Sequence, residues 1–149
     1  MTNDAFNFDT SLIFALVNGN VSTAIQRKLS QNFKSSGIAL TPDQWFVMLV
    51  LSIKDSRTQN DLCTATYKDK AGMTRLLDSM ERQELILRVP SKEDKRVKYI
   101  KLTRLGREIA EKAQFIANRT LKAALRGLSM EEIKVCQEAM RIIFSNATD

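Results

Sequence analysis

The sequence predicts a mainly α-helical protein with one small β-hairpin. Over most of the 149 residues, apolar side chains recur every three or four positions, which is the period of an amphipathic helix. The exception is VPSKEDKRVKYIKLT, residues 89–103, where a charged loop separates two short apolar segments that contain β-branched residues. A chain of this length forms one domain of ordinary size and buries a substantial core without disulfides or metal ions.

Two helices are predicted in the first third of the chain. The first covers residues 10–36, where Gly19 is a weak point and Gly37 ends the helix. The second begins after Thr41, whose hydroxyl forms a predicted capping box with Gln44, three residues further on. A proline at the first helical position supports this start, and the polar sequence KDS marks the expected end.

Two more helices follow, the first of them short. Thr58 and Asp61 repeat the capping signal and predict a helix of about two turns. After a turn, residues 68–83 form a longer helix with one apolar stripe and one polar face. The predicted stripe consists of Met73, Leu76, Leu77 and Met80.

The last third of the chain begins with the hairpin. Residues 85–89 and 97–102 are its predicted strands, although their alternation of apolar and polar side chains is imperfect. Thr103 then caps a long helix, and Ser129 with Glu132 forms a capping box that opens the final one.

A helix, a short helix, a turn, a helix and a hairpin in this order make a winged helix-turn-helix. In that motif the last of the three helices lies in the major groove of DNA, and its N-terminal residues reach base edges. Residues 68–83 are therefore the predicted recognition helix. Small residues allow a close approach and donors bind DNA, so the predicted contacts are Lys70, Ala71, Gly72, Thr74 and Arg75. Phosphate would repel Asp69, which we expect to cap the helix.

The hairpin concentrates the positive charge of the chain. Residues 88–104 hold seven basic and two acidic residues, and the net charge of the whole chain is +6. Such a cluster favours a polyanion as partner, although a solvated surface is the alternative. We expect Arg96 to enter a narrow minor groove, supported by Lys92, Lys95 and Lys98. Asp94 completes the predicted DNA-binding set: it either orients Arg96 or caps the hairpin turn.

Two stretches, DKAGMTRLLDSMERQELI and EDKRVKYIKLTRLG, resemble the MarR family of bacterial regulators, the multiple antibiotic resistance regulators. The family's recognition helix commonly ends in T-R-L-L-D-x-L-E-x-x-G-L-I, which residues 74–86 resemble. Its wing carries D-x-R and then L-T-x-x-G, matched by residues 94–96 and 102–106. Glu84 replaces the family's glycine, so it either adopts a left-handed conformation or ends the helix differently. Ala71 and Gly72 replace a hydroxyl-rich turn, so the operator cannot be carried over from relatives.

The resemblance implies one domain over residues 1–149, with a winged-helix core at 41–102 and dimerisation helices at 10–36 and 104–146. It implies a DNA-binding transcriptional regulator, expected to be a repressor that acts as a homodimer on palindromic operators. The terminal helices support a dimer, because one small core is not expected to cover their full apolar stripes. The predicted interface residues are Leu12, Leu16, Ile133, Met140 and Ile143; the alternative is that they belong to the protein's own core.

Relatives often sense small amphipathic or phenolic compounds in a pocket between the dimerisation and DNA-binding parts. By resemblance, we expect such an effector here, with Trp45, Phe46 and Met48 as the predicted lining residues. A stripe of aromatic and methionine side chains at helical spacing is more often part of an ordinary core.

The composition argues against catalysis and against a bound cofactor. The chain has no histidine, no glycine-rich phosphate loop and no cluster of metal ligands, so we expect no enzyme activity and no metal. Cys63 and Cys136 are predicted to be small buried hydrophobes. The N-terminus has neither a secretory signal nor a membrane span, so a cytoplasmic protein without a membrane partner is expected. A winged helix that binds proteins is the alternative function, against which the cationic hairpin argues.

Overall fold

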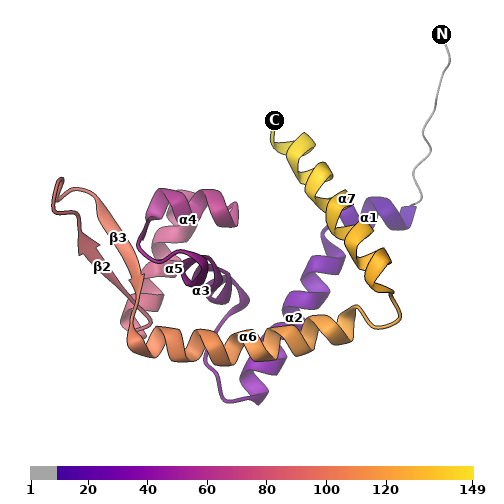
Figure 1. Cartoon of the computed structure of the whole chain (residues 1–149), viewed down its shortest axis with the longest axis horizontal. Coiled ribbons are helices and arrows are strands. Elements are labelled where there is room, and N and C mark those ends of the chain that lie inside the picture. Colours follow the sequence, from indigo (N-terminus) through magenta and orange to yellow (C-terminus); the bar gives the residue numbers. More distant parts are fainter. Residues whose placement is uncertain (1–9) are drawn as a thin grey trace, which may run out of the picture.

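The computed structural model describes residues 10–149 and is mainly helical, as predicted. In chain order the elements are α1 Thr10–Val17, α2 Asn20–Ser35, α3 Pro42–Ile53, β1 Arg57–Thr58, α4 Gln59–Thr66, α5 Lys70–Arg82, β2 Ile86–Pro90, β3 Lys98–Leu102, α6 Arg104–Ala124 and α7 Met130–Thr148. The β2–β3 hairpin lies at one end of the molecule, α1 and α7 lie at the other, and α6 runs between them (Figure 1). No described helix is both long and apolar enough to cross a membrane. The first nine residues, where no secretory signal is expected, lie outside the described part.

The single helix expected over residues 10–36 is in fact two helices that meet at Gly19. This glycine has a left-handed backbone with φ of 62° and ψ of 25°. A side chain at Gly19 would meet nothing within 4 Å, so backbone freedom rather than crowding accounts for the break. The other end agrees with the prediction, because α2 stops just before Gly37, whose φ is 72°.

The predicted helix starts are capped in the structure. Gln44 N donates to the Thr41 hydroxyl at 3.2 Å, and Thr41 N donates to Gln44 Oε1 at 3.0 Å. The same reciprocal box opens α4 and α7, between Thr58 and Asp61 and between Ser129 and Glu132. Because a capping box involves residues only three positions apart, the sequence alone predicted where α3, α4 and α7 begin.

A third strand, which the sequence did not predict, extends the hairpin into a small sheet. β1 pairs antiparallel with β3, with Arg57 opposite Ile100, and the strand order is β1-β3-β2. A strand of two residues is too short to show an alternating pattern, and its partner lies far along the chain. Within the hairpin Pro90 lies opposite Lys98 at the turn end of the ladder.

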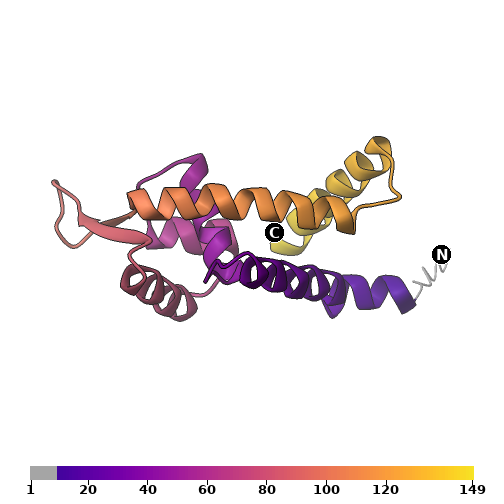
Figure 2. The same cartoon turned by 90° about the horizontal axis from the view of Figure 1, so that it is seen from below.

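The core lies between α2, α3, α4, α5, α6 and the base of the sheet. The largest fully buried side chains come from most of these elements: Phe33, Val47, Met48, Leu51, Leu62, Met73, Leu77, Met80, Ile86 and Ile100. α6 instead contributes the small residues Ala110, Ala113 and Ala117, which let α2 and α3 pack closely against it. Figure 2 shows α2 and α6 as two neighbouring layers, with the hairpin at the left end of the molecule.

The corner between α5, β2 and α6 explains two positions of the family pattern. Glu84 adopts the left-handed conformation, with φ of 59°, and Leu85 N then donates to the Met80 carbonyl at 3.0 Å. A side chain at Gly106 would overlap the carbonyl oxygen of Leu85. The final glycine of L-T-x-x-G is therefore required by a close backbone approach.

Candidate nucleic-acid interface

The predicted recognition helix α5 buries one face and exposes the other. Asp69 caps it as predicted, with Gly72 N donating to Asp69 Oδ1 at 2.7 Å. Its core-facing stripe consists of Met73, Leu77 and Met80. Among the predicted DNA contacts on the outer face, Gly72 is half-buried and the others are exposed: Lys70, Ala71, Thr74 and Arg75. The exposed face thus carries cationic and hydroxyl groups around a small first turn.

Gly72 also has a role inside the protein. A Cβ at this position would lie 2.5 Å from Asp69 Oδ1, the oxygen that caps the helix. Glycine therefore leaves room for the capping oxygen. Because it has no side chain, it also lets another molecule come close to the backbone of the first turn. The first-turn amides of α5 that lack intrahelical partners favour an anion near the start of the helix.

The tip of the wing holds Arg96 in solvent. The hairpin projects from the body of the protein (Figure 1), and 92% of the Arg96 side chain is exposed. Asp94 Oδ1 accepts from Arg96 N at 3.0 Å and from Arg96 Nε at 3.2 Å, and Oδ2 accepts from Nη2 at 3.2 Å. Both alternatives for Asp94 therefore hold, since it caps the turn and orients the guanidinium. The side-chain and then the backbone hydrogen bond from Arg96 lower the pKa of the Asp94 carboxyl.

Arg88 is not a free cation of the wing, although it belongs to the seven bases of the charged segment. Its guanidinium donates to Asp78 Oδ1 at 2.7 Å and to Glu81 Oε1 at 3.0 Å, and only 18% of its side chain is exposed. Both carboxylates lie on α5. Arg88 therefore fastens β2 to the recognition helix, a role that no local sequence pattern indicates. The three wing lysines predicted to bind DNA are exposed: Lys92, Lys95 and Lys98.

The predicted effector residues differ in their surroundings. Trp45 and Met48 are buried in the core, whereas Phe46 is half-buried. Phe46 lines a cavity of about 500 Å³ among α2, α3 and the α4–α5 turn. In its wall Lys68 Nζ forms an ion pair with Asp43 Oδ2 at 3.0 Å. An effector at these residues stays a prediction.

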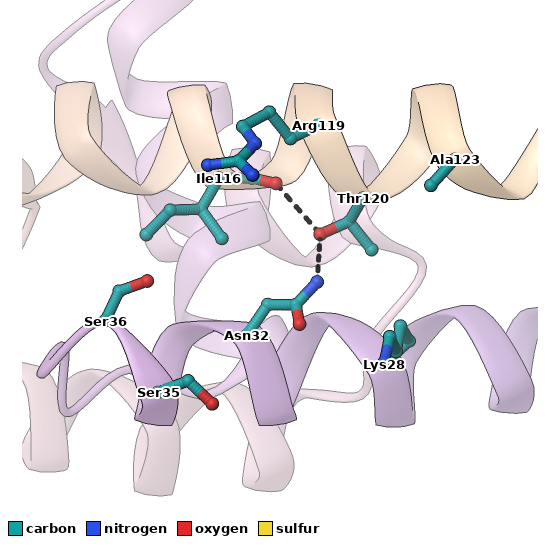
Figure 3. A pocket seen from close by; sticks show the side chains of 8 residues that line it. All are labelled: Lys28, Asn32, Ser35, Ser36, Ile116, Arg119, Thr120 and Ala123. Carbon is teal, nitrogen blue, oxygen red and sulfur yellow. Dashed lines mark hydrogen bonds between the residues drawn. The ribbon is translucent and has the colours of Figure 1, made fainter.

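Another cavity, of about 270 Å³, lies where α2 crosses α6 (Figure 3). Between the helices Asn32 Nδ2 donates to the buried Thr120 hydroxyl at 2.8 Å, and that hydroxyl donates to a backbone carbonyl one turn earlier. The cationic groups of Lys28 and Arg119 lie on opposite sides of this pair, so they do not converge on one ligand position (Figure 3). The hydrogen-bonded pair fastens the helix crossing.

The predicted dimer residues lie on the outside of the described chain. Four of the five are exposed: Leu12, Leu16, Met140 and Ile143. Ile133 is half-buried. α7 has no buried residue at all, and its described contacts include a ring pair between Phe144 and Tyr67, with centroids 5.6 Å apart. The five residues therefore do not belong to the core seen here, and their role in a dimer stays a prediction.

The cysteine prediction was wrong for Cys136. It is exposed on α7, because that helix buries nothing within the described chain, and Cys63 is half-buried. The Cys63 sulfur lies 3.9 Å from the Asp69 carbonyl oxygen, beside the start of α5. Within residues 10–149, no group of three or more carboxylate or cysteine side chains is arranged to hold a metal ion.

Known proteins resemble both the sequence and the fold. Residues 39–97 match the model of the MarR family. The HTH-type transcriptional repressor IacR of Pseudomonas putida is 21% identical over 132 residues, which cover 89% of this chain and 75% of IacR. The S. aureus MepR–DNA complex has a TM-score of 0.78 at 25% identity, covering 94% of this chain and 99% of MepR. Bordetella bronchiseptica BpsR, solved to explain how 6-hydroxynicotinic acid regulates its DNA binding, has a TM-score of 0.80 at 19% identity, covering 92% of this chain and 96% of BpsR.

Proposed function

Because this chain is a DNA-binding transcriptional regulator of the MarR family, we propose that it acts in the cytoplasm as a homodimeric repressor on palindromic operators. One observation carries the proposal. The exposed face of α5 and the exposed Arg96 of the wing are held in a fixed relation by the ion pairs of Arg88. The matched family consists of regulators, and we propose no catalytic activity.

The recognition helix and the wing suit two neighbouring grooves. A major groove about 12 Å wide admits α5, and Ala71 and Gly72 let its backbone approach. Lys70 and Arg75 then supply donors to phosphates or base edges. Arg96, oriented by Asp94, extends toward an adjacent minor groove, where a narrow A·T-rich segment concentrates negative potential.

The dimer would bring two recognition helices to one operator. We take residues 10–36 and 104–146 as the dimerisation helices around a winged core at 41–102. The apolar side chains that α1 and α7 leave exposed supply the surface for a second copy. A two-fold pair reads half-sites about 10 base pairs apart, which makes the operator a palindrome.

We place a small amphipathic or phenolic effector in the cavity lined by Phe46, with Trp45 and Met48 packed behind it. DNA binding by the structural relative BpsR is regulated by 6-hydroxynicotinic acid. The cavity borders the α4–α5 turn. A ligand that displaced Lys68 from Asp43 would shift the start of the recognition helix, and so would weaken operator binding.

Selection of bound fragments from genomic DNA, followed by binding isotherms at several salt concentrations, tests the proposal. We expect palindromic fragments and a steep linear fall of log affinity with log salt. Arg96→Ala should weaken binding and make the slope shallower by about two, because the homodimer loses one phosphate-neutralising cation from each protomer.

Arg126→Ala is the matched control, because Arg126 is exposed in the turn before α7 and forms no ion pair with a described residue. It should retain both the affinity and the slope. Binding that ignored salt and Arg96 would instead support a winged helix used for protein interaction.

A further inference from the structure

Gln59, the first residue of α4, reaches across to the recognition helix. Its Nε2 donates to the Thr74 hydroxyl at 2.7 Å and to the Lys70 carbonyl oxygen at 3.3 Å. Both partners belong to the predicted DNA-contacting set, so Gln59 lies at the edge of the surface that would face DNA. The sequence does not single out Gln59, because both of its partners lie on a different helix.

The direction of these hydrogen bonds follows from the chemistry of the groups. A carbonyl oxygen only accepts, so the amide nitrogen of Gln59, not its oxygen, faces Lys70. The Thr74 hydroxyl lies 2.9 Å from the same carbonyl, and it must therefore give that oxygen its single hydrogen. Gln59 occupies one of the two lone pairs of Thr74 Oγ1. What remains on the exposed hydroxyl is one acceptor position.

We propose that Gln59 sets a base preference of the recognition helix by holding Thr74 as a hydrogen-bond acceptor. The donors in the major groove are the exocyclic amino groups of adenine (N6) and cytosine (N4). A hydroxyl fixed in this way favours those bases over guanine or thymine at the same step of the half-site. It is also poorly matched to phosphate oxygens, which only accept.

The inference rests on the proposed function and deepens it. Thr74 is the contacting residue, and Gln59 is a positioning residue that acts through it. Without Gln59, the Thr74 hydroxyl would regain its second lone pair and could turn its hydrogen toward DNA. The base preference at that step should then relax, whereas the other contacts of α5 and the wing stay in place.

The test is selection from a duplex library with randomised palindromic half-sites, using the full chain in five forms. These are wild type, Gln59→Met, Thr74→Val, the double variant that combines the two, and Asn60→Ala. Methionine keeps the length of Gln59 without a donor, and valine keeps the shape of Thr74 without a hydroxyl. Asn60 is an exposed neighbour on α4 and serves as the control.

We expect wild type and Asn60→Ala to select adenine or cytosine at one step of each half-site. Gln59→Met and Thr74→Val should each lose that preference by roughly threefold to tenfold, the value of one hydrogen bond, and at the same step. The double variant should lose no more than either single one. A variant that failed to fold would lose selection at every step, so the loss at a single step is the informative result.

Three results would overturn the inference. They are an unchanged preference in Gln59→Met, a loss at a different step from that of Thr74→Val, and a guanine or thymine preference that depends on Thr74. In each of these cases wild-type selection survives, and the proposed function stands. Wild-type protein that selects no sequence at all would remove both the inference and the proposed function.

Discussion

Glu84 has an unfavourable backbone conformation and lies in the corner between α5, β2 and α6, where hydrogen bonds hold the chain. It is one of three non-glycine residues with positive φ within residues 10–149, the others being Ser56 and Tyr67. The left-handed conformation costs an L residue about 1–2 kcal/mol, because Cβ approaches the next carbonyl oxygen. The Glu84 carbonyl accepts from the Thr103 hydroxyl at 2.6 Å, which helps to hold the strained turn.

Glu84→Gly should therefore stabilise the protein. Removing Cβ relieves the strain, while the extra freedom of glycine in the unfolded chain offsets part of the gain, so we expect about 0.5–1 kcal/mol. Urea unfolding measures the change. Arg82→Gly is the control at a helical position, where glycine should cost about 1 kcal/mol. A loss of stability in Glu84→Gly would show that the side chain contributes more than the strain costs.

Residue roles could be predicted where the partner lies nearby in sequence. The cap by Asp69 and the pairing of Asp94 with Arg96 both involve groups within three positions of one another. Arg88 could not be assigned, because its partners sit on the preceding helix and only the folded chain brings them to β2. Charge counting alone therefore overstated the number of free cations on the wing.

At the scale of elements, local signals predicted the helices better than the sheet. Capping boxes and the 3.6-residue period fixed the starts of α3, α4 and α7. Gly19 was visible as a weak point, but whether a glycine bends or breaks a helix depends on the packing of both halves. β1 escaped prediction because its two residues pair with β3, which lies far along the chain.

The ion pairs between β2 and α5 give the wing its fixed position, which leads to a prediction for Arg88→Ala. Two carboxylates would lose their shared cation, so stability should fall by about 1–2 kcal/mol. DNA affinity should also fall, because the wing would no longer be held in a fixed position relative to α5. The salt slope should stay unchanged, since Arg88 does not neutralise a phosphate.

Lys101→Ala is the matched control for Arg88→Ala. Lys101 is a half-buried cation on the other strand of the hairpin, and no ion pair ties it to another described residue. Its loss should change stability by less than about 0.5 kcal/mol. A shallower salt slope in Arg88→Ala would contradict the structure, because it would make Arg88 a DNA contact.

At the scale of the whole molecule, the described chain divides into a packed core and two uncovered helices. The end opposite the wing is formed by α1 and α7 (Figure 1), where Leu16, Met140 and Ile143 are exposed. The sequence predicted these apolar stripes, because periodicity is local. It could not decide between an internal core and a partner, because that depends on where α7 lies in the fold. Large apolar side chains exposed on these two helices are expected to pack against a second copy.

Carboxylates on the apolar side of α7 should separate the two copies. We expect the double variant Met140→Glu, Ile143→Glu to be a folded monomer by sedimentation, because the core of α2–α6 contains no residue of α7. Its affinity for a full palindrome should fall roughly a hundredfold or more, since the second half-site is no longer tethered. The salt slope should drop to about half, because one protomer neutralises half the phosphates.

Lys134→Glu separates the effect of the interface from that of added negative charge. Lys134 is exposed on α7 and shares the polar side of the helix with Glu138 and Arg141, so this variant should remain dimeric. Its affinity for the palindrome should therefore change little. A dimeric double variant would place the contact between copies elsewhere. A monomeric variant that kept the full affinity and the full salt slope would mean that a single chain binds the whole operator. That result would contradict the two-fold arrangement on which a palindromic operator depends.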